Sequence, residues 1–235
     1  MLAASASNAA TLAAKAATAT IPIIFSIGGD PVALGLVGSL NRPGGNLTGA
    51  SFLTTETAAK MLEVLHELLP DAGITALFNP ANPVTETQTR ELLEAARVIG
   101  VKLEVLAASN ERDIEAAIET LVQRRAGGLI VQGDSLFYDH SKQLVALTLR
   151  HRIAAIFHTR NIVEAGGLMS YGGNLEEASR IAGFYAGRIL RGEKVANLPV
   201  QQVTKVELVI NMNTAKALGL TFPTALLVRA DEVIE

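Results

Sequence analysis

The chain has 235 residues, of which 49% are hydrophobic and 18% charged, with a formal net charge of −3 and no cysteine or tryptophan. This composition excludes intrinsic disorder and any disulfide or thiolate chemistry, and the lack of a basic surplus argues against nucleic acid as a partner. A chain of this length can bury one large core or two smaller ones.

The first twenty residues predict an alanine-rich helix. Ten of them are Ala, and the first basic side chain is Lys15. Because this segment has neither a basic start nor a Leu/Val-rich stretch, it lacks the pattern of a secretory signal peptide. We expect a helix that is capped by Ser5 or Ser7 and ends near Thr18.

The following segment predicts two strands, each followed by a helix. Residues 21–27 form a short apolar run, typical of a buried parallel strand, that stops at a Gly-Gly-Asp-Pro turn. Residues 32–40 predict a short helix and residues 47–52 a second strand. Residues 54–69 carry a periodic apolar stripe and predict an amphipathic helix.

The middle of the chain alternates regularly between strand and helix patterns. Apolar runs begin at Ile74, Val101, Gly128 and Ile153, so their starts are 27, 27 and 25 residues apart. The helical patterns between them cover residues 86–99, 111–125 and 141–150. Strand–helix–strand units at this spacing predict right-handed crossovers in a mostly parallel sheet, and therefore an α/β fold.

The last third of the chain predicts shorter, less regular elements. In chain order we expect a weak strand, a helix, an extended stretch, a strand, a helix that ends at Gly219, and a closing apolar segment: residues 167–171, 175–191, 199–204, 207–211, 213–218 and 226–233.

The residues after each predicted strand are the candidate ligand contacts, because ligands of open parallel sheets bind beyond the carboxyl ends of the strands. Two carboxylates occur there, Asp30 and Asp134, together with amide, hydroxyl and aromatic side chains. Such a set suits a small zwitterion, since a carboxylate binds an ammonium group and helix N-termini bind a carboxylate. Each residue also has an alternative role as a helix cap, a loop residue or a packing residue.

Motifs of catalysis and of cofactor binding are absent from the sequence. It contains no phosphate-binding G-x-x-x-x-G-K-[ST] loop and no G-x-S-x-G nucleophile turn. Its four histidines show no zinc-binding spacing, and Gly28-Gly29 lacks the third glycine of a dinucleotide site. We therefore expect no enzyme, no metal and no cofactor.

Three segments closely resemble one family, the ABC-transporter substrate-binding proteins of the tryptophan/tyrosine-binding type. They are IPIIFSIGGDPVALGLVGSLNRPGGNLTGAS, EAGGLMSYGGN and LPVQQVTKVELVINMNTAKALGLTFPTALLVRADEVIE. The resemblance runs along essentially the whole chain. It implies a two-lobed periplasmic-binding-protein fold of type I, with parallel sheets and a small amino-acid-like ligand held between the lobes.

The resemblance also implies an assignment of lobes, site and partners. The first lobe would be residues 1–52 and 172–199, and the second residues 53–171 and 200–235. The ligand-binding residues carried over by position are Gly29, Asp30, Asn79, Thr85, Asp134, Phe137 and Tyr171. The partners would be the membrane subunits of an ABC permease, the location would be the periplasm, and the protein would perform no chemistry.

The sequence departs from the family pattern at its start. A signal sequence and the leading strands of the first lobe are not found before the alanine-rich helix, so we expect an incomplete first lobe with an unpaired sheet edge. An unpaired edge of this kind indicates either that the chain is truncated or that the protein forms a homo-oligomer in which another copy covers the edge. A sensory or regulatory ligand-binding domain on the same fold is the alternative function, and a fold-matched enzyme comes third.

Overall fold

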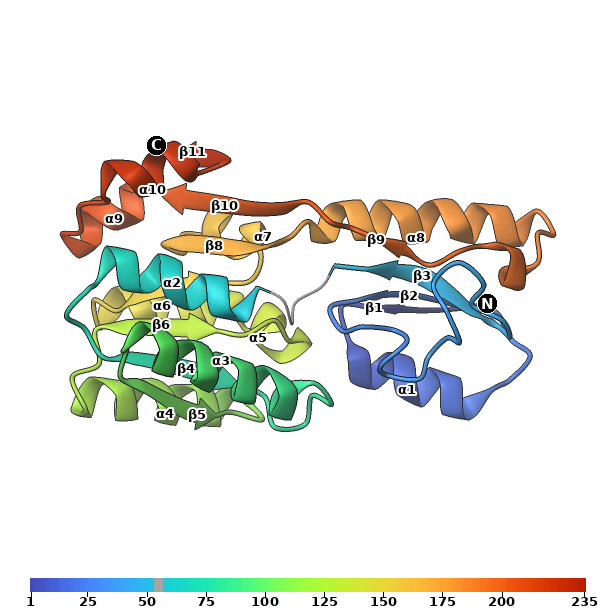
Figure 1. Cartoon of the computed structure of the whole chain (residues 1–235), viewed down its shortest axis with the longest axis horizontal. Helices are drawn as coiled ribbons and strands as arrows, with labels where there is room; N and C mark the ends of the chain where they lie inside the picture. The colour runs from blue at the N-terminus through green and yellow to red at the C-terminus, as the bar shows by residue number, and fades with distance from the viewer. Residues whose placement is uncertain (53–56) are drawn as a thin grey trace. The chain divides into compact units, whose positions relative to one another are not determined.

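The computed structural model describes residues 1–52 and 57–235. The chain forms two compact units, each with its own β-sheet of parallel strand pairs (Figure 1). Unit 1 comprises Met1–Thr55 and Gly173–Lys205, and unit 2 comprises Glu56–Gly172 and Val206–Glu235. The expected α/β class with parallel sheets is confirmed.

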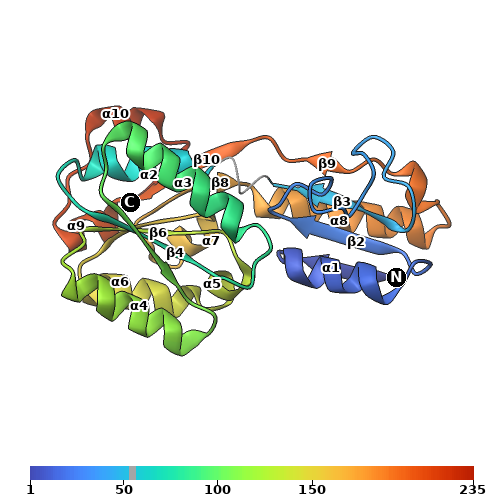
Figure 2. The ribbon, with the colours of Figure 1, turned by 60° about the horizontal axis from the view of Figure 1, so that its bottom comes forward.

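Unit 1 contains a four-stranded sheet in the order β1-β2-β3-β9. Its elements are β1 (Leu2–Ser5), α1 (Asn8–Ala17), β2 (Ile23–Ile27), β3 (Leu47–Ser51), α8 (Leu175–Leu190), a 3-10 turn (Val195–Asn197) and β9 (Gln201–Gln202). Alternate residues of β2 face opposite sides of the sheet, so Ile24 packs under α8 while Phe25 packs on the side of α1. Figure 2 shows these two helices on opposite faces of the sheet.

Unit 2 contains a seven-stranded sheet in the order β11-β10-β8-β7-β6-β4-β5. Its strands are β4 (Ile74–Phe78), β5 (Leu103–Ala107), β6 (Gly128–Val131), β7 (Ala154–Phe157), β8 (Met169–Gly173), β10 (Val206–Asn211) and β11 (Glu232–Ile234). Its helices are α2 (Ala58–Leu68), α3 (Thr85–Ile99), α4 (Glu111–Gln123), α5 (Ser135–Asp139), α6 (Ser141–Arg150), α7 (Arg160–Glu164), α9 (Met212–Leu218) and α10 (Thr224–Arg229).

Two helical layers bury both faces of the unit 2 sheet. One face packs against α2, α3, α9 and α10, and the other against α4, α5, α6 and α7 (Figure 2). The central strands β4, β6 and β7 are buried along their whole length, which explains why they are continuous apolar runs in the sequence. This packing holds the ends of the strands, and the loops that follow them, in fixed positions.

Most predicted elements are confirmed within a few residues, but one helix is wrong. Residues 32–40 form turns and bends. Gly35 adopts a left-handed φ of 65°, which interrupts helical bonding, and the N–H groups of Leu36 and Val37 both donate to the Pro31 carbonyl. The start of the helix predicted over residues 54–69 lies outside the described residues.

The sequence analysis missed several short elements. The strand β1 has an alanine-rich sequence that favours helix, and it forms because Leu2 to Ser5 pair with Ile23 to Ser26 of β2. In the described part of the chain β1 lies at the end of its sheet. The short helices α5 and α7 were missed because five residues are too few to show a helical period.

The assignment of residues 200–235 to the second lobe is wrong for residues 200–205. These residues belong to unit 1, because β9 pairs with β3 and because Val203 packs in the same core cluster as Ile24. The Val203 N–H also donates to the carbonyl of Ser51 at 2.8 Å. The chain therefore leaves unit 1 for the last time immediately before β10.

Candidate functional site

The carboxyl ends of β4, β6 and β7 lie at one edge of the unit 2 sheet, because these neighbouring strands run parallel. The loops that follow these strands begin at Asn79, Gln132 and His158. Five of the seven predicted ligand-binding residues belong to unit 2, and four of them, Asn79, Thr85, Asp134 and Phe137, lie at this edge.

Asp134 joins two of these loops. Its Oδ1 accepts hydrogen bonds from Asn79 Nδ2 at 2.9 Å and from the Leu136 N–H at 2.9 Å, and its Oδ2 accepts one from Asn82 Nδ2 at 2.8 Å. Thr85 donates its hydroxyl to the Asn79 carbonyl at 2.5 Å, which closes the same loop from the other side. Asp134 thus caps α5 and also fixes the loop between β4 and α3.

A small pocket lies beside Asp134 and is confined to unit 2. Its lining residues come from the ends of β6 and β7 and from the helices after them: Val131, Gln132, Gly133, Asp134, Phe137, Tyr138, His158, Thr159 and Ile162. The cavity has a volume of about 20 Å³, which is enough for about one water-sized group. Both amide atoms of Gln132, whose side chain is 3% exposed, lack a hydrogen-bond partner among the described residues.

His158 contributes a neutral imidazole to this pocket. Burial lowers its pKa from 6.5 to about 4, because the charged form would lose its hydration. Its Nε2 lies 2.9 Å from the hydroxyl of Thr57, which precedes α2. At neutral pH the pocket therefore has no positive charge from His158, and Asp134 is the charged group among its lining residues.

Phe137 and Tyr171 pack into the hydrophobic cores of unit 2. Phe137 is 1% exposed and belongs to the core that includes Ile114 and Leu144, although it also lines the pocket. Tyr171 lies in β8 and packs against the core cluster that includes α2. A binding role for either ring stays a prediction.

The predicted residues of unit 1 lie at the carboxyl end of β2. The Gly29 N–H donates to Asn8 Oδ1 at 3.2 Å, and its carbonyl accepts the hydroxyl of Ser51 at 2.9 Å. Asp30 is exposed, and its Oδ1 accepts from the N–H groups of Val32 and Ala33 at 2.8 and 3.3 Å. Asp30 therefore caps the turn that follows, where its alternative role predicted a helix cap.

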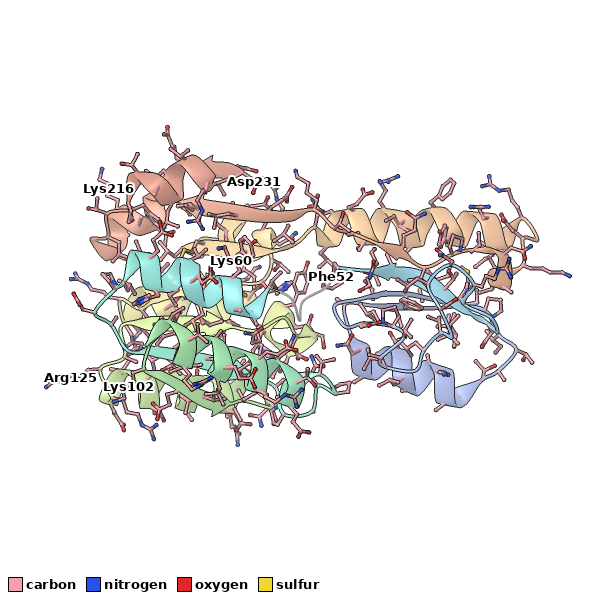
Figure 3. All side chains as sticks on the ribbon, viewed as in Figure 1. Phe52, Lys60, Lys102, Arg125, Lys216 and Asp231 are labelled. Carbon is pink, nitrogen blue, oxygen red and sulfur yellow. The ribbon has the colours of Figure 1, made fainter. Side chains whose placement is uncertain are left out.

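A second hollow lies where the unit 2 strands begin, at the opposite edge of the sheet. Its basic lining residues include Lys102 and Arg125, which Figure 3 shows at the same end of the unit. Arg124, which also lines it, is paired with Glu104. Ligands of parallel sheets bind at the carboxyl edge, so this hollow lies at the edge where a ligand is not expected.

Gln132 and Asn82 follow predicted strands of this edge but were not among the predicted ligand-binding residues, and the contribution of Thr57 was missed. Gln132 is the first polar residue after the apolar run of β6, and this position was the available signal. Within the described residues there is no group of three or more His, Cys, Asp or Glu side chains that could hold a metal ion. In that part of the chain we also find no helix with the length and hydropathy of a membrane span.

Comparison with known proteins assigns the family. The family model described as "ABC transporter substrate binding protein" matches residues 1–234. The chain belongs to this family. This confirms the resemblance drawn from the sequence segments around residues 21–51, 164–174 and 198–235.

Proteins similar to this substrate-binding protein include one named for tyrosine and one solved in complex with L-Trp. It is 31% identical over 210 residues to a "Tyrosine-binding protein" of Clostridioides difficile, covering 88% of this chain and 60% of the relative. A Streptococcus pneumonia ABC domain in complex with L-Trp is 27% identical with a TM-score of 0.82, covering 96% of this chain and 77% of that one.

A third similar protein is a conserved domain protein of Vibrio cholerae. It is 28% identical with a TM-score of 0.83, and the match covers 95% of this chain and 75% of that one. These structural matches support the periplasmic-binding-protein fold of type I for this substrate-binding protein. The chain spans 60% of the length of the tyrosine-binding relative that it matches.

Proposed function

We propose that this protein is the solute receptor of an ABC importer and that it binds an amino-acid-like ligand at the carboxyl edge of the unit 2 sheet. The observation that carries the proposal is the pocket at that edge, with the buried amide of Gln132 and the carboxylate of Asp134 among its lining residues. Membership of the substrate-binding family, the relative named for tyrosine and the similar structure in complex with L-Trp support an amino acid as the ligand.

The proposed ligand contacts include the predicted residues on both units. Asp134 accepts three hydrogen bonds, and a carboxylate has about four acceptor positions, so Oδ2 retains capacity for a ligand ammonium group. In this proposal Asn79 and Thr85 hold Asp134 and its loop in place. The backbone of Gly29 and the side chain of Asp30 would contact the ligand from unit 1 when the two units close around it.

The remaining parts of the proposal follow from family membership. The receptor would work in the periplasm, deliver its ligand to the membrane subunits of an ABC permease, and carry out no reaction and need no cofactor. Association of copies through the β1 edge is part of the same proposal, because an edge strand has free backbone groups that can pair with another strand.

A thermal-shift screen of the purified chain against the L-amino acids tests the proposed function. A ligand at about 100 times its dissociation constant stabilises the folded state by about 2.7 kcal/mol. For a domain of about 200 residues this raises Tm by roughly 5–10 °C. We expect the largest shifts with tyrosine or tryptophan. Compounds that lack the amino or the carboxyl group, 3-(4-hydroxyphenyl)propionate and tyramine for tyrosine, serve as matched controls and should give smaller shifts. A screen in which no amino acid changes Tm would contradict the proposal.

A further inference from the structure

Two polar side chains of the unit 2 pocket have buried atoms without partners. Gln132 is 3% exposed, and neither its Nε2 nor its Oε1 has a hydrogen-bond partner among the described residues. Thr159 Oγ1 is also buried and also has no hydrogen-bond partner among the described residues. Thr159 occupies the N-cap position of α7. A threonine there normally accepts a hydrogen bond from its helix, but this one makes no such bond.

These atoms are costly to leave without partners. A buried amide or hydroxyl that loses its hydrogen bonds with water keeps the full desolvation penalty unless another group replaces them. Gln132 and Thr159 line the same cavity, together with Asp134 and His158. A group that enters this cavity can therefore supply the missing hydrogen bonds of both side chains.

The volume of the cavity limits what can enter. About 20 Å³ is enough for about one water-sized group, so a ring or a branched chain does not fit inside it. The occupant is a single small polar group of the ligand. The rest of the ligand, including the ammonium group proposed to bind Asp134 Oδ2, lies outside the cavity.

The chemistry of the lining selects among small polar groups. A carboxylate accepts from Gln132 Nε2 but leaves Oε1 without a donor, and it meets the negative charge of Asp134 without a compensating charge from the neutral His158. An ammonium group donates to Oε1 but leaves Nε2 without an acceptor. A hydroxyl group both donates and accepts, so it can donate a hydrogen bond to Oε1 and accept one from Nε2.

We propose that Gln132 and Thr159 form a subsite for a hydroxyl group of the ligand, so that the protein prefers a hydroxylated amino acid to its analogue without the hydroxyl. This inference rests on the proposed function and specifies which part of the ligand enters unit 2. A site built to hydrogen-bond a hydroxyl discriminates strongly against an analogue that lacks it, because its buried polar groups are then left unpaired.

The test is a calorimetric titration of the full chain with matched pairs: tyrosine and phenylalanine, serine and alanine, threonine and valine. We expect the hydroxylated member of the pair that binds to be at least about tenfold tighter. Gln132→Met, which removes both amide atoms and keeps a similar shape, should reduce the ratio to within about twofold, chiefly by weakening the hydroxylated ligand. Gln143→Met on α6, outside the pocket, is the matched control and should leave the ratio unchanged.

The Tm of the ligand-free variant separates a binding role of Gln132 from a structural one. Removing an amide that has no partner should leave Tm equal to or above that of the wild type, whereas a structural amide would lower it. Thr159→Val is an independent variant that should also lower the preference for the hydroxyl, whether or not Gln132→Met folds.

Three results would overturn the inference. If amino acids bind but hydroxylated and plain members of each pair bind equally, a water molecule is the occupant and the subsite does not exist, while the proposed function stands. If the preference exists and survives both Gln132→Met and Thr159→Val, another part of the protein provides it. If no amino acid binds, the proposed function fails and this inference fails with it.

Discussion

Replacing Gly172 with alanine should destabilise the protein by about 3 kcal/mol or more, at the upper end of the range for overpacking a core. Gly172 lies in β8, and a Cβ atom placed on it would be 1.9 Å from the carbonyl oxygen of His158 and 2.8 Å from its Nδ1. Because the nearest clash is with backbone, a change of side-chain rotamer cannot relieve it. The end of β7 must move instead.

Chemical denaturation of the wild type and of Gly172→Ala measures this effect. The matched control is Gly183→Ala in α8, where an added Cβ meets no atom within 4 Å. There the same substitution should stabilise the protein by about 0.5–1 kcal/mol, since alanine is the better helix former. If the free energy of unfolding of Gly172→Ala is within about 1 kcal/mol of that of the wild type, β8 does not approach His158 this closely.

Acidification should remove about 3 kcal/mol of stability through His158, because its pKa is about 4 in the folded protein and 6.5 in the unfolded chain. Below pH 6.5 the unfolded chain takes up a proton that the folded protein does not bind. The contribution of the neutral imidazole is therefore complete above pH 6.5, decreases as the pH falls, and is lost at about pH 4.

His158→Gln tests this pH dependence, because glutamine cannot take up the proton and can still hydrogen-bond to Thr57. We expect the free energy of unfolding of the variant to fall less steeply between pH 7 and pH 4 than that of the wild type. Urea denaturation at several pH values gives both curves. Parallel curves would show that His158 is protonated equally in the folded and unfolded states, contrary to its complete burial.

The sequence predicts the central part of the fold well because burial on both faces produces a simple pattern. The strands at Ile74, Gly128 and Ala154 are continuous apolar runs, and the helices between them carry one-sided apolar stripes. The strand β1 is not predicted by such a pattern, since Leu2-Ala3-Ala4-Ser5 becomes a strand only through its pairing with β2. Long-range pairing of this kind cannot be predicted from local composition.

The sequence predicts which residues lie at the carboxyl edge of the unit 2 sheet, but not the contacts that each of them makes there. Asn79 and Asp134 were expected at one edge because they follow neighbouring parallel strands, and they do lie 2.9 Å apart through Nδ2 and Oδ1. What each side chain does there depends on which neighbours satisfy it, and that could not be inferred from spacing. Asp134 accepts hydrogen bonds from the amides of Asn79 and Asn82, whereas Gln132, which was not among the predicted ligand-binding residues, retains two buried atoms without partners in the described structure.

The central claim is that an amino-acid-like ligand binds at the carboxyl edge of the unit 2 sheet. Hydrogen–deuterium exchange of the full chain, with and without the amino acid that raises Tm most, tests it most directly. We predict that ligand slows exchange in residues 79–85, 132–138 and 158–162, the loops that end β4, β6 and β7. Protection confined to the opposite edge, around Lys102 and residues 124–126, would contradict the claim.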